Sequence, residues 1–182
     1  ISRIAPAVAR AAITSGIARK TITDWEAYQE QLEKRIGEDD RLMRRMTGKA
    51  KTDPKRIVFA EGADIKVLLA IQEIVTEKIA HPILIGNTTE IENLKKQLHL
   101  KIDELTIFDP AVEKEKIREY TQAYYKLRQR KGITAEQAEE LMHNSNFIGL
   151  MMVESGDGDG LISGIHSDYR HVLRAAKDII GL

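Results

Sequence analysis

The chain has 182 residues, of which 42% are hydrophobic and 31% charged, so it can bury a substantial core as a globular protein does. Its 28 lysines and arginines balance its 28 aspartates and glutamates, which argues against nucleic-acid and anionic-membrane partners. The lack of cysteine excludes disulfides, thiolate metal sites and a cysteine nucleophile and favours the cytoplasm, and no apolar run reaches the roughly 20 residues of a membrane span. Because the sequence opens with isoleucine and stops directly after a helical pattern, we expect a piece of a longer protein.

The first residues have the spacing of two helices. Ile4 and Val8 recur at helical intervals, and Gly16 is a natural helix stop. A capping-box pattern at Thr23 and Glu26 predicts the start of the second helix. That helix carries one apolar stripe, formed by Trp25, Tyr28, Leu32 and Ile36. We favour a stripe that packs within its own chain over a partner surface, and the stripe also leads us to expect a homo-oligomer.

A basic run covers residues 41–56 and contains Thr47, Gly48 and Pro54. This composition predicts a solvated linker, which we place at residues 37–54. A phosphate-binding role is the alternative, and the neutral overall charge and the lack of interleaved aromatic residues argue against it. Residues 1–36 then form a helical region of their own, and residues 55–182 form a second domain.

Strands and helices alternate from residue 55 onward. The expected strands cover residues 56–60, 81–87, 105–109 and 161–163. The expected helices cover residues 63–79, 89–100, 112–132, 134–145 and 146–156. Thr134 and Gln137 have the pattern of a cap at the start of the fourth of these helices. This alternation predicts an α/β fold, with a parallel sheet covered by helices and preceded by the helices of the first region.

The glycine- and aspartate-rich segment at residues 153–170, VESGDGDGLISGIHSDYR, fits three different roles. Asp157 and Asp159 take the first and third positions of a calcium-binding loop, but the fifth and sixth positions hold Leu161 and Ile162. These side chains provide neither the ligand nor the glycine that such a loop needs. We therefore expect no metal ion at this segment.

A phosphate site and a plain connecting turn are the two remaining roles. Three glycines within residues 156–160 let the chain turn sharply into residues 161–163, a strand that we expect to be buried. We expect at least one of these glycines to have a positive φ, because the chain must reverse there. Ser163 and Gly164 then end that strand with free backbone amides, at the edge of a parallel sheet where ligands gather. The spacing fits both roles equally well.

A second strand that runs into a glycine is found at residues 56–62. Glu61 stands at its end, where it either touches a ligand or caps the following helix, and the sequence leaves both open. Of the two neighbouring tyrosines further along, we expect Tyr124 to pack in the core and Tyr125 to lie at the surface.

Three segments resemble the phosphotransacetylases, the phosphate acetyltransferase family. They are RIVFAEG at residues 56–62, HPILIGN at 81–87 and GITAEQAEELMHNSNFIGLMMVESGDGDGLISG at 132–164. The resemblance covers residues 55–182 and is to the opening part of these enzymes, so we expect these residues to be the first part of an incomplete domain. It implies a parallel-sheet three-layer sandwich of the phosphotransacetylase type, a fold shared with isocitrate and isopropylmalate dehydrogenases.

The segment RIAPAVARAAITSGIARKTITDWEAYQEQL, at residues 3–32, looks like the end of a bacterial malic enzyme catalytic region. Together the two parts resemble the hybrid NADP-dependent malic enzymes, in which a malic enzyme module precedes a phosphotransacetylase-like domain. This resemblance implies oxidative decarboxylation of malate to pyruvate and CO2, with NADP and Mg²⁺ or Mn²⁺. The catalytic residues would lie upstream of Ile1, so we expect none in this chain.

The chain departs from phosphotransacetylases just after Ser163 and Gly164. The threonine-rich stretch and Arg-Pro pair of that family are replaced by IHSDYRHVLRAAKDIIG, in which Arg174 takes the arginine position and Ala175 the proline position. Tyr169 resembles the version found in the hybrid enzymes. These departures argue against independent phosphotransacetylase activity.

The resemblance therefore implies a regulatory and oligomerisation domain that senses acetyl-CoA. The effector carries a pyrophosphate and a 3'-phosphate, so its site needs basic side chains and backbone amides. The candidate residues are Ser163, Gly164, Tyr169 and Arg174. Two alternatives stay open, namely an active phosphate acetyltransferase that makes acetyl phosphate from acetyl-CoA and phosphate, and an assembly domain that binds no ligand.

Overall fold

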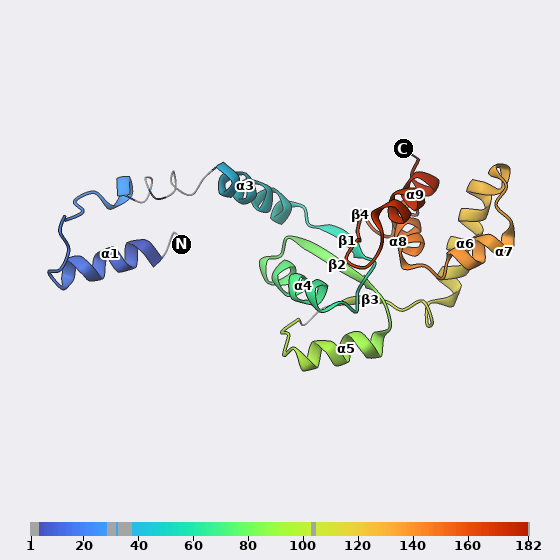
Figure 1. Cartoon of the computed structure of the whole chain (residues 1–182), viewed down its shortest axis with the longest axis horizontal. Helices are drawn as coiled ribbons and strands as arrows, with labels where there is room; N and C mark the ends of the chain where they lie inside the picture. Colours follow the sequence, from blue (N-terminus) through green and yellow to red (C-terminus); the bar gives the residue numbers. More distant parts are fainter. Residues whose placement is uncertain (1–3, 29–31, 33–37, 103–104, 182) are drawn as a thin grey trace. The chain divides into compact units, whose positions relative to one another are not determined.

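A computed structural model describes residues 4–28, 32, 38–102 and 105–181 of the chain (Figure 1). The chain divides into two compact units, Ile1–Lys49 and Ala50–Leu182. The smaller unit is helical, and the larger unit contains the sheet. None of the described helices is long and apolar enough to cross a lipid bilayer.

The first unit begins with helix α1 (Ile4–Thr14), as its apolar spacing predicts. Gly16, at φ +73°, follows the helix in the left-handed conformation that glycine adopts most easily. Residues 25–28 are helical as well, but the side chain that caps this turn belongs to Asp24, which accepts a hydrogen bond from the Ala27 amide at 2.9 Å. The prediction that Thr23 caps this turn is therefore wrong, because the cap is the next residue, Asp24.

The predicted stripe of the second helix is described only in part, because Ile36 lies outside the described residues. The rings of Trp25 and Tyr28 meet edge to face, with their centroids 6.0 Å apart. The guanidinium of Arg10 lies 4.7 Å from the centre of the indole of Trp25. The stripe thus packs within its own unit at these two positions.

The basic segment predicted as a linker forms a helix, α3 (Glu38–Thr52). Its apolar side chains Leu42, Met43 and Met46 are all more than half exposed. Charged residues with long side chains favour a helix in such a sequence even without an apolar face to bury. The domain boundaries at residues 36 and 54 stay a prediction.

The second unit is built on a four-stranded parallel sheet in the order β3-β2-β1-β4. The strands are β1 (Lys55–Phe59), β2 (Ala80–Ile85), β3 (Thr106–Phe108) and β4 (Gly160–Ile162). Val58 of β1 pairs with Ile83 on one side and Leu161 on the other. All strands end at one edge of the sheet because they are parallel.

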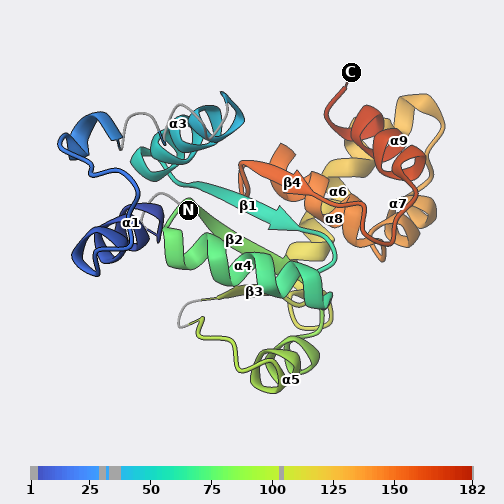
Figure 2. The ribbon, with the colours of Figure 1, turned by 60° about the vertical axis from the view of Figure 1, so that its left-hand side comes forward.

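Helices cover both faces of this sheet (Figure 2). The helices are α4 (Ile65–Glu77), α5 (Thr88–Gln97), α6 (Lys114–Arg128), η1 (Gln129–Lys131), α7 (Ala135–Leu141), α8 (Ser145–Glu154) and α9 (Tyr169–Ile179). The side chains of α4 and α5 pack with Phe59 and Leu84 in one core. Those of α6, α7, α8 and α9 pack with Val58 and Ile83 in a second core on the other face. The predicted three-layer α/β sandwich is confirmed.

Successive strand residues alternate between the two cores, as the period of a β-strand requires. Tyr124 of α6 is fully buried in the second core against the ring of Phe147, and Tyr125 is half-buried at its margin. Tyr124 therefore packs as predicted. The predicted capping box of α7 is present too, with hydrogen bonds in both directions between Thr134 and Gln137.

Candidate functional site

A cavity of about 440 Å³ lies at the edge of the sheet where the parallel strands end. It is lined by residues that follow β1, β2 and β3 and by the start of α8. These lining residues include Glu61, Gly86, Asp109, His143 and Ser145. Ligands of open α/β sheets bind outside the carboxyl ends of the strands, so this cavity is the candidate site of the second unit.

Gly62 brings the end of β1 close to the end of β2. Its amide donates a hydrogen bond to the carbonyl of Ile85 at 3.1 Å. A Cβ at position 62 would lie 2.7 Å from that same carbonyl oxygen, closer than a Cβ atom approaches a non-bonded atom in proteins. Only glycine fits this position, and the resulting close contact forms one wall of the cavity.

Asp109 follows β3 and is 7% exposed. Its carboxylate accepts hydrogen bonds from the amides of Thr88 and Ala111, at 2.8 and 3.0 Å. These two donors hold the pKa of Asp109 below its ordinary value. The carboxylate therefore fixes the start of α5 and the turn after β3, and it is ionised at neutral pH.

Glu61 follows β1 and holds the loop that follows β4. Its carboxylate accepts hydrogen bonds from four successive backbone amides, at distances from 2.9 to 3.2 Å. The donors are Gly164, Ile165, His166 and Ser167. Burial raises the pKa of Glu61, but the four donors outweigh burial and the pKa lies below its ordinary value. Of the two roles left open for Glu61, capping of the next helix is wrong, because Asp64 caps α4. Contact with a ligand stays a prediction, and Glu61 is one of the residues that line the cavity.

Asp64 adds a second contact to the same loop. One of its carboxylate oxygens caps α4 by accepting from the amides of Lys66 and Val67. The other oxygen lies 2.8 Å from Nε2 of His166, whose side chain is otherwise exposed. One side chain therefore connects the start of α4 with the loop after β4.

Asn146 of α8 makes the third contact and is 5% exposed. The hydroxyl of Ser163 donates to its Oδ1 at 2.5 Å, and its Nδ2 donates to the hydroxyl of Ser167 at 3.1 Å. Sequence reasoning missed this residue because it stands in an apolar helix. A buried amide among apolar neighbours was the available signal, since such groups need hydrogen-bond partners.

The four predicted acetyl-CoA residues come from two segments, the end of β4 and helix α9. Ser163 and Gly164 lie side by side at the end of β4, with Gly164 at φ +120°. The prediction of free backbone amides is wrong for Gly164, because its amide donates to Glu61 at 3.1 Å. No hydrogen bond or ion pair within the described part of the chain joins Arg174 to either residue.

Tyr169 and Arg174 stand on α9, and both are exposed. Tyr169 is the first residue of the helix and is 72% exposed. Burial raises the pKa of Tyr124 in α6, as does the charge of Asp178, and the charges of Arg128 and Arg174 act in the opposite direction.

The glycine-rich turn lies at the opposite edge of the sheet, before β4. Gly156 has a φ of +79°, which confirms that this turn needs at least one left-handed glycine. The carboxylate of Asp157 accepts from the hydroxyl of Tyr120 and the ammonium of Lys116. The carboxylate of Asp159 instead accepts from the backbone amide and the guanidinium of Arg56, both at 2.8 Å. This contact lowers the pKa of Asp159 to about 2. Asp157 and Asp159 therefore bind different partners and do not face one shared site.

Two further findings concern this segment. Among the described residues no group of three or more histidine, aspartate and glutamate side chains is placed to hold a metal ion. The strand at residues 161–163 was expected to be buried, and this is wrong for Ile162, which is 53% exposed. The reason is that β4 is paired on one side only, with β1, in the described sheet.

The cavity combines two ionised carboxylates with few charges of the other sign. None of the described residues that line it is a lysine or an arginine. The carboxylates of Glu61 and Asp109 are already bound to backbone amides, so both are poor proton acceptors at neutral pH. Exposed cations stand outside the lining, for example Lys66 near the start of α4 and Arg170 and Arg174 on α9.

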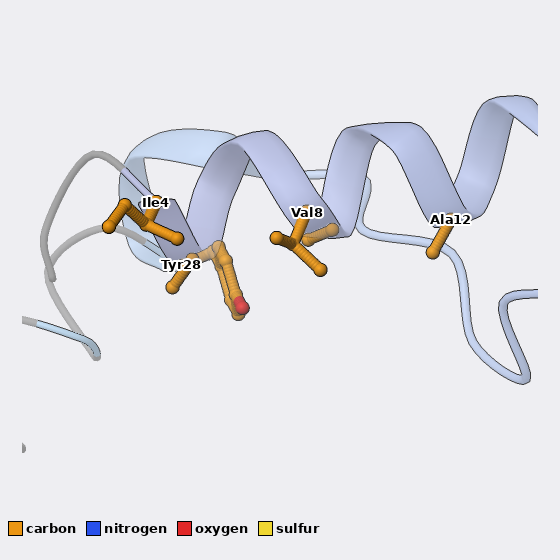
Figure 3. Close-up of a pocket in the computed structure, with 6 residues that line it drawn as sticks. Ile4, Val8, Ala12 and Tyr28 are labelled. Atoms are coloured by element: carbon orange, nitrogen blue, oxygen red, sulfur yellow. The ribbon is translucent and has the colours of Figure 1, made fainter.

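A separate apolar pocket of about 430 Å³ lies within the first unit (Figure 3). Ile4, Val8 and Ala12 project from one side of α1, and Tyr28 lies beside them. The side chains of Ile4 and Val8 are 68% and 62% exposed. None of the described lining residues is charged, so the pocket offers a mainly apolar surface.

Comparison with known proteins connects this arrangement to one family. The sequence model described as phosphate acetyl/butaryl transferase matches residues 41–182. The phosphate acetyltransferase of Thermoanaerobacterium thermosaccharolyticum is 39% identical over 132 residues, which are 72% of this chain and 39% of that protein. The EutD phosphotransacetylase of Staphylococcus aureus has a similar structure, with a TM-score of 0.65 at 32% identity, over 75% of this chain and 41% of that chain.

Malic enzymes match a longer part of the chain. The NADP-dependent malic enzyme of Salmonella typhimurium is 38% identical over 184 aligned residues, and that of Escherichia coli is 36% identical. In both cases the alignment covers 100% of this chain and 24% of the relative. The chain thus spans about a quarter of the malic enzymes that it matches. By the family match over residues 41–182 and the shared parallel sheet, this chain belongs to the phosphate acetyl/butaryl transferase family.

Proposed function

We propose that this chain is the phosphotransacetylase-like regulatory and assembly part of an NADP-dependent malic enzyme, and that acetyl-CoA is its effector. The observation that carries the proposal is the extent of the two similarities. Malic enzymes match the whole chain, whereas the phosphate acetyltransferase from Thermoanaerobacterium matches 72% of it and the family model begins at residue 41. The helical first unit is therefore what links this chain to malic enzymes.

In this proposal the whole enzyme oxidises malate to pyruvate and CO2. In a module upstream of Ile1, NADP would accept the hydride and Mg²⁺ or Mn²⁺ would polarise the substrate. We assign no catalytic residue to the present chain. The cysteine-free sequence favours a cytoplasmic enzyme.

The exposed surface of α9 supports the choice of effector. Acetyl-CoA carries a pyrophosphate, a 3'-phosphate and an adenine ring. The guanidinium of Arg174 has no ion-pair partner among the described residues and offers a permanent positive charge to a phosphate. The exposed ring of Tyr169 offers a face on which a base can stack. Backbone amides at Ser163 and Gly164 complete the candidate set, although that of Gly164 is already bonded to Glu61.

An active phosphate acetyltransferase is the second candidate, and the similarity to named phosphotransacetylases favours it. Transfer of an acetyl group needs a base and a stabiliser for the oxyanion near the thioester. The two carboxylates of the cavity have lowered pKa values, which makes them weak bases. The described site therefore supports binding better than it supports catalysis.

Assembly without a ligand is the third candidate. The exposed apolar side chains of α1 support a role in assembly, since apolar surface of this kind is stabilised by a partner. We propose that the chain forms a homo-oligomer both as a regulatory domain and as an assembly domain without a ligand.

Two measurements on the purified full-length enzyme separate the three candidates. Calorimetric titration with acetyl-CoA should give saturable binding, and the absence of heat at millimolar effector would leave only the assembly role. A coupled assay for acetyl phosphate should give no rate above background in the presence of acetyl-CoA and phosphate. A clear rate in that assay would replace the regulatory proposal with the transferase.

A further inference from the structure

We propose that Glu61 is a positioning residue whose carboxylate fixes the conformation of residues 163–168, the loop that carries the effector candidates into α9. The part of this proposal that concerns acetyl-CoA rests on the proposed function above. The part that concerns the conformation of the loop rests on geometry alone. Glu61 and the loop amides are 103 to 106 positions apart in the sequence, so the contact joins distant segments of the fold.

Each of the two carboxylate oxygens of Glu61 accepts two hydrogen bonds from the loop. One oxygen accepts from the amides of Gly164 and Ile165, and the other accepts from those of His166 and Ser167. Four successive amides point to one centre only if the backbone curls around it, which makes an anion-binding concavity. The left-handed conformation of Gly164 begins this curl. The protein's own carboxylate thus takes the place that an external anion has in other backbone concavities.

Polar contacts, and not apolar burial, hold this loop. Ile165, its one large apolar residue, is 42% exposed. In the described part of the chain, the hydrogen bonds between the loop and other elements are made by three side chains. These are Glu61 after β1, Asp64 at the start of α4, and Asn146 in α8. Glu61 alone supplies four of these hydrogen bonds, so the conformation of the loop depends most on it.

The loop also sets where α9 begins. Asp168 caps that helix by accepting from the amide of Arg170, directly after the last amide that Glu61 binds. The far end of α9 is held by Ile179 in the core and by the ion pair between Arg128 and Asp178. A ligand on the exposed face of α9 is therefore connected through the loop to Glu61, which lines the cavity at the end of β1.

A carboxylate is needed here because a neutral amide cannot accept on both sides. Glutamine has one acceptor oxygen, and its NH2 group would face two backbone N–H donors. Glu61→Gln therefore removes about half of the contacts and sets donors against donors. Glu61→Asp keeps both acceptor oxygens on a shorter side chain, and should keep more of the loop's protection. Glu73→Gln, at an exposed position of α4, is the matched control.

The first experiment is amide hydrogen exchange in the full-length enzyme, read by mass spectrometry on peptides that contain residues 163–168. We expect exchange on the order of tenfold faster in Glu61→Gln than in the parent, with Glu61→Asp between them and Glu73→Gln unchanged. In Glu61→Ala, formate should restore protection in these peptides and nowhere else, because it refills the concavity with a carboxylate. Equal protection in the parent and all Glu61 variants, or no effect of formate, overturns the proposal.

The second experiment measures malate oxidation as a function of acetyl-CoA concentration, with each variant's rate in the absence of acetyl-CoA as its own reference. We expect Glu61→Gln to need several-fold more acetyl-CoA for half of its response, and Glu61→Asp to need less than Glu61→Gln. A faster-exchanging loop with an unchanged acetyl-CoA response overturns the coupling of Glu61 to the effector. If the parent ignores acetyl-CoA, the proposed function fails, and the exchange data still decide the positioning role of Glu61.

Discussion

Replacement of the three glycines before β4 by alanine tests how the turn is built, because the structure assigns each glycine a different constraint. Gly156 has a φ of +79°, and a Cβ there meets nothing within 4 Å. Gly158 lies outside the left-handed region, but a Cβ there would lie 2.6 Å from Cγ2 of Val58. A Cβ at Gly160 would lie 3.5 Å from Cδ1 of Ile57, an ordinary contact.

These constraints give three different expected costs. Gly156→Ala should destabilise the fold by about 1 kcal/mol through backbone strain alone. Gly158→Ala should cost about 1 to 3 kcal/mol, because Val58 is fully buried in the core and cannot move aside without overpacking. Gly160→Ala should stay within about 0.5 kcal/mol of the parent.

The assay is native-state hydrogen exchange of β1 and β4 amides in the full-length enzyme, which reports the free energy of opening of this region. Further substitutions separate backbone strain at Gly156 from overpacking at Gly158. Gly156→Asn should cost less than Gly156→Ala, since asparagine tolerates the left-handed conformation. Gly158→Ala combined with Val58→Ala should cost less than the sum of the two single changes, because the shortened side chain makes room for the new Cβ.

The reasoning fails if the order is different. A Gly160→Ala variant as destabilised as Gly158→Ala would mean that contact distance does not set the cost. Additive effects of Gly158→Ala and Val58→Ala would show that the two positions do not meet as the structure describes. Equal costs for Gly156→Ala and Gly156→Asn would remove the argument from the backbone angle.

Three further predictions concern the effector, the assembly and the pH dependence. Arg174→Ala should need several-fold more acetyl-CoA for half-maximal response, because a permanent charge that meets a phosphate is lost; an unchanged titration curve would remove Arg174 from the site. Light scattering of the full-length enzyme at micromolar concentration should give a dimer or larger assembly, and a monomer would contradict the assembly role. Glu61 and Asp64 both have lowered pKa values, so their contribution to stability is complete above their ordinary values of 4.5 and 3.8 and is lost as the pH falls through the lower, folded pKa values. Exchange protection of residues 164–167, corrected for the intrinsic rate, should therefore be constant from pH 7 to pH 5 and fall only in more acidic solution, and a loss of protection between pH 7 and pH 5 would contradict this assignment.

Local patterns in the sequence predict most of the second unit. The alternation of apolar strands and amphipathic helices predicts the parallel sheet with its two helical layers. The capping box at Thr134 and Gln137 and the left-handed glycine in the turn are predicted as well, since each depends on residues within a few positions of one another. Local rules fail at residue 24, where two neighbouring side chains are both good helix caps and the structure uses Asp24.

The candidate site is less predictable because its contacts join distant segments. Nothing near Glu61 in the sequence indicates that its carboxylate binds amides more than 100 positions away. Asn146 is hidden in an apolar helix, and its partners Ser163 and Ser167 come from the loop after β4. The exposure of Ile162 depends on which strands pair with β4, and strand order is a tertiary property.

The most direct test of the regulatory role is the rate of malate oxidation by the full-length enzyme, with NADP and Mg²⁺ saturating, across a titration of acetyl-CoA. Coupling between two binding sites is typically worth about 1 to 3 kcal/mol, which corresponds to a change of about fivefold or more in apparent affinity. We predict a saturable change of at least this size in the malate concentration that gives half of the maximal rate. A malate dependence that is identical with and without acetyl-CoA would contradict the account.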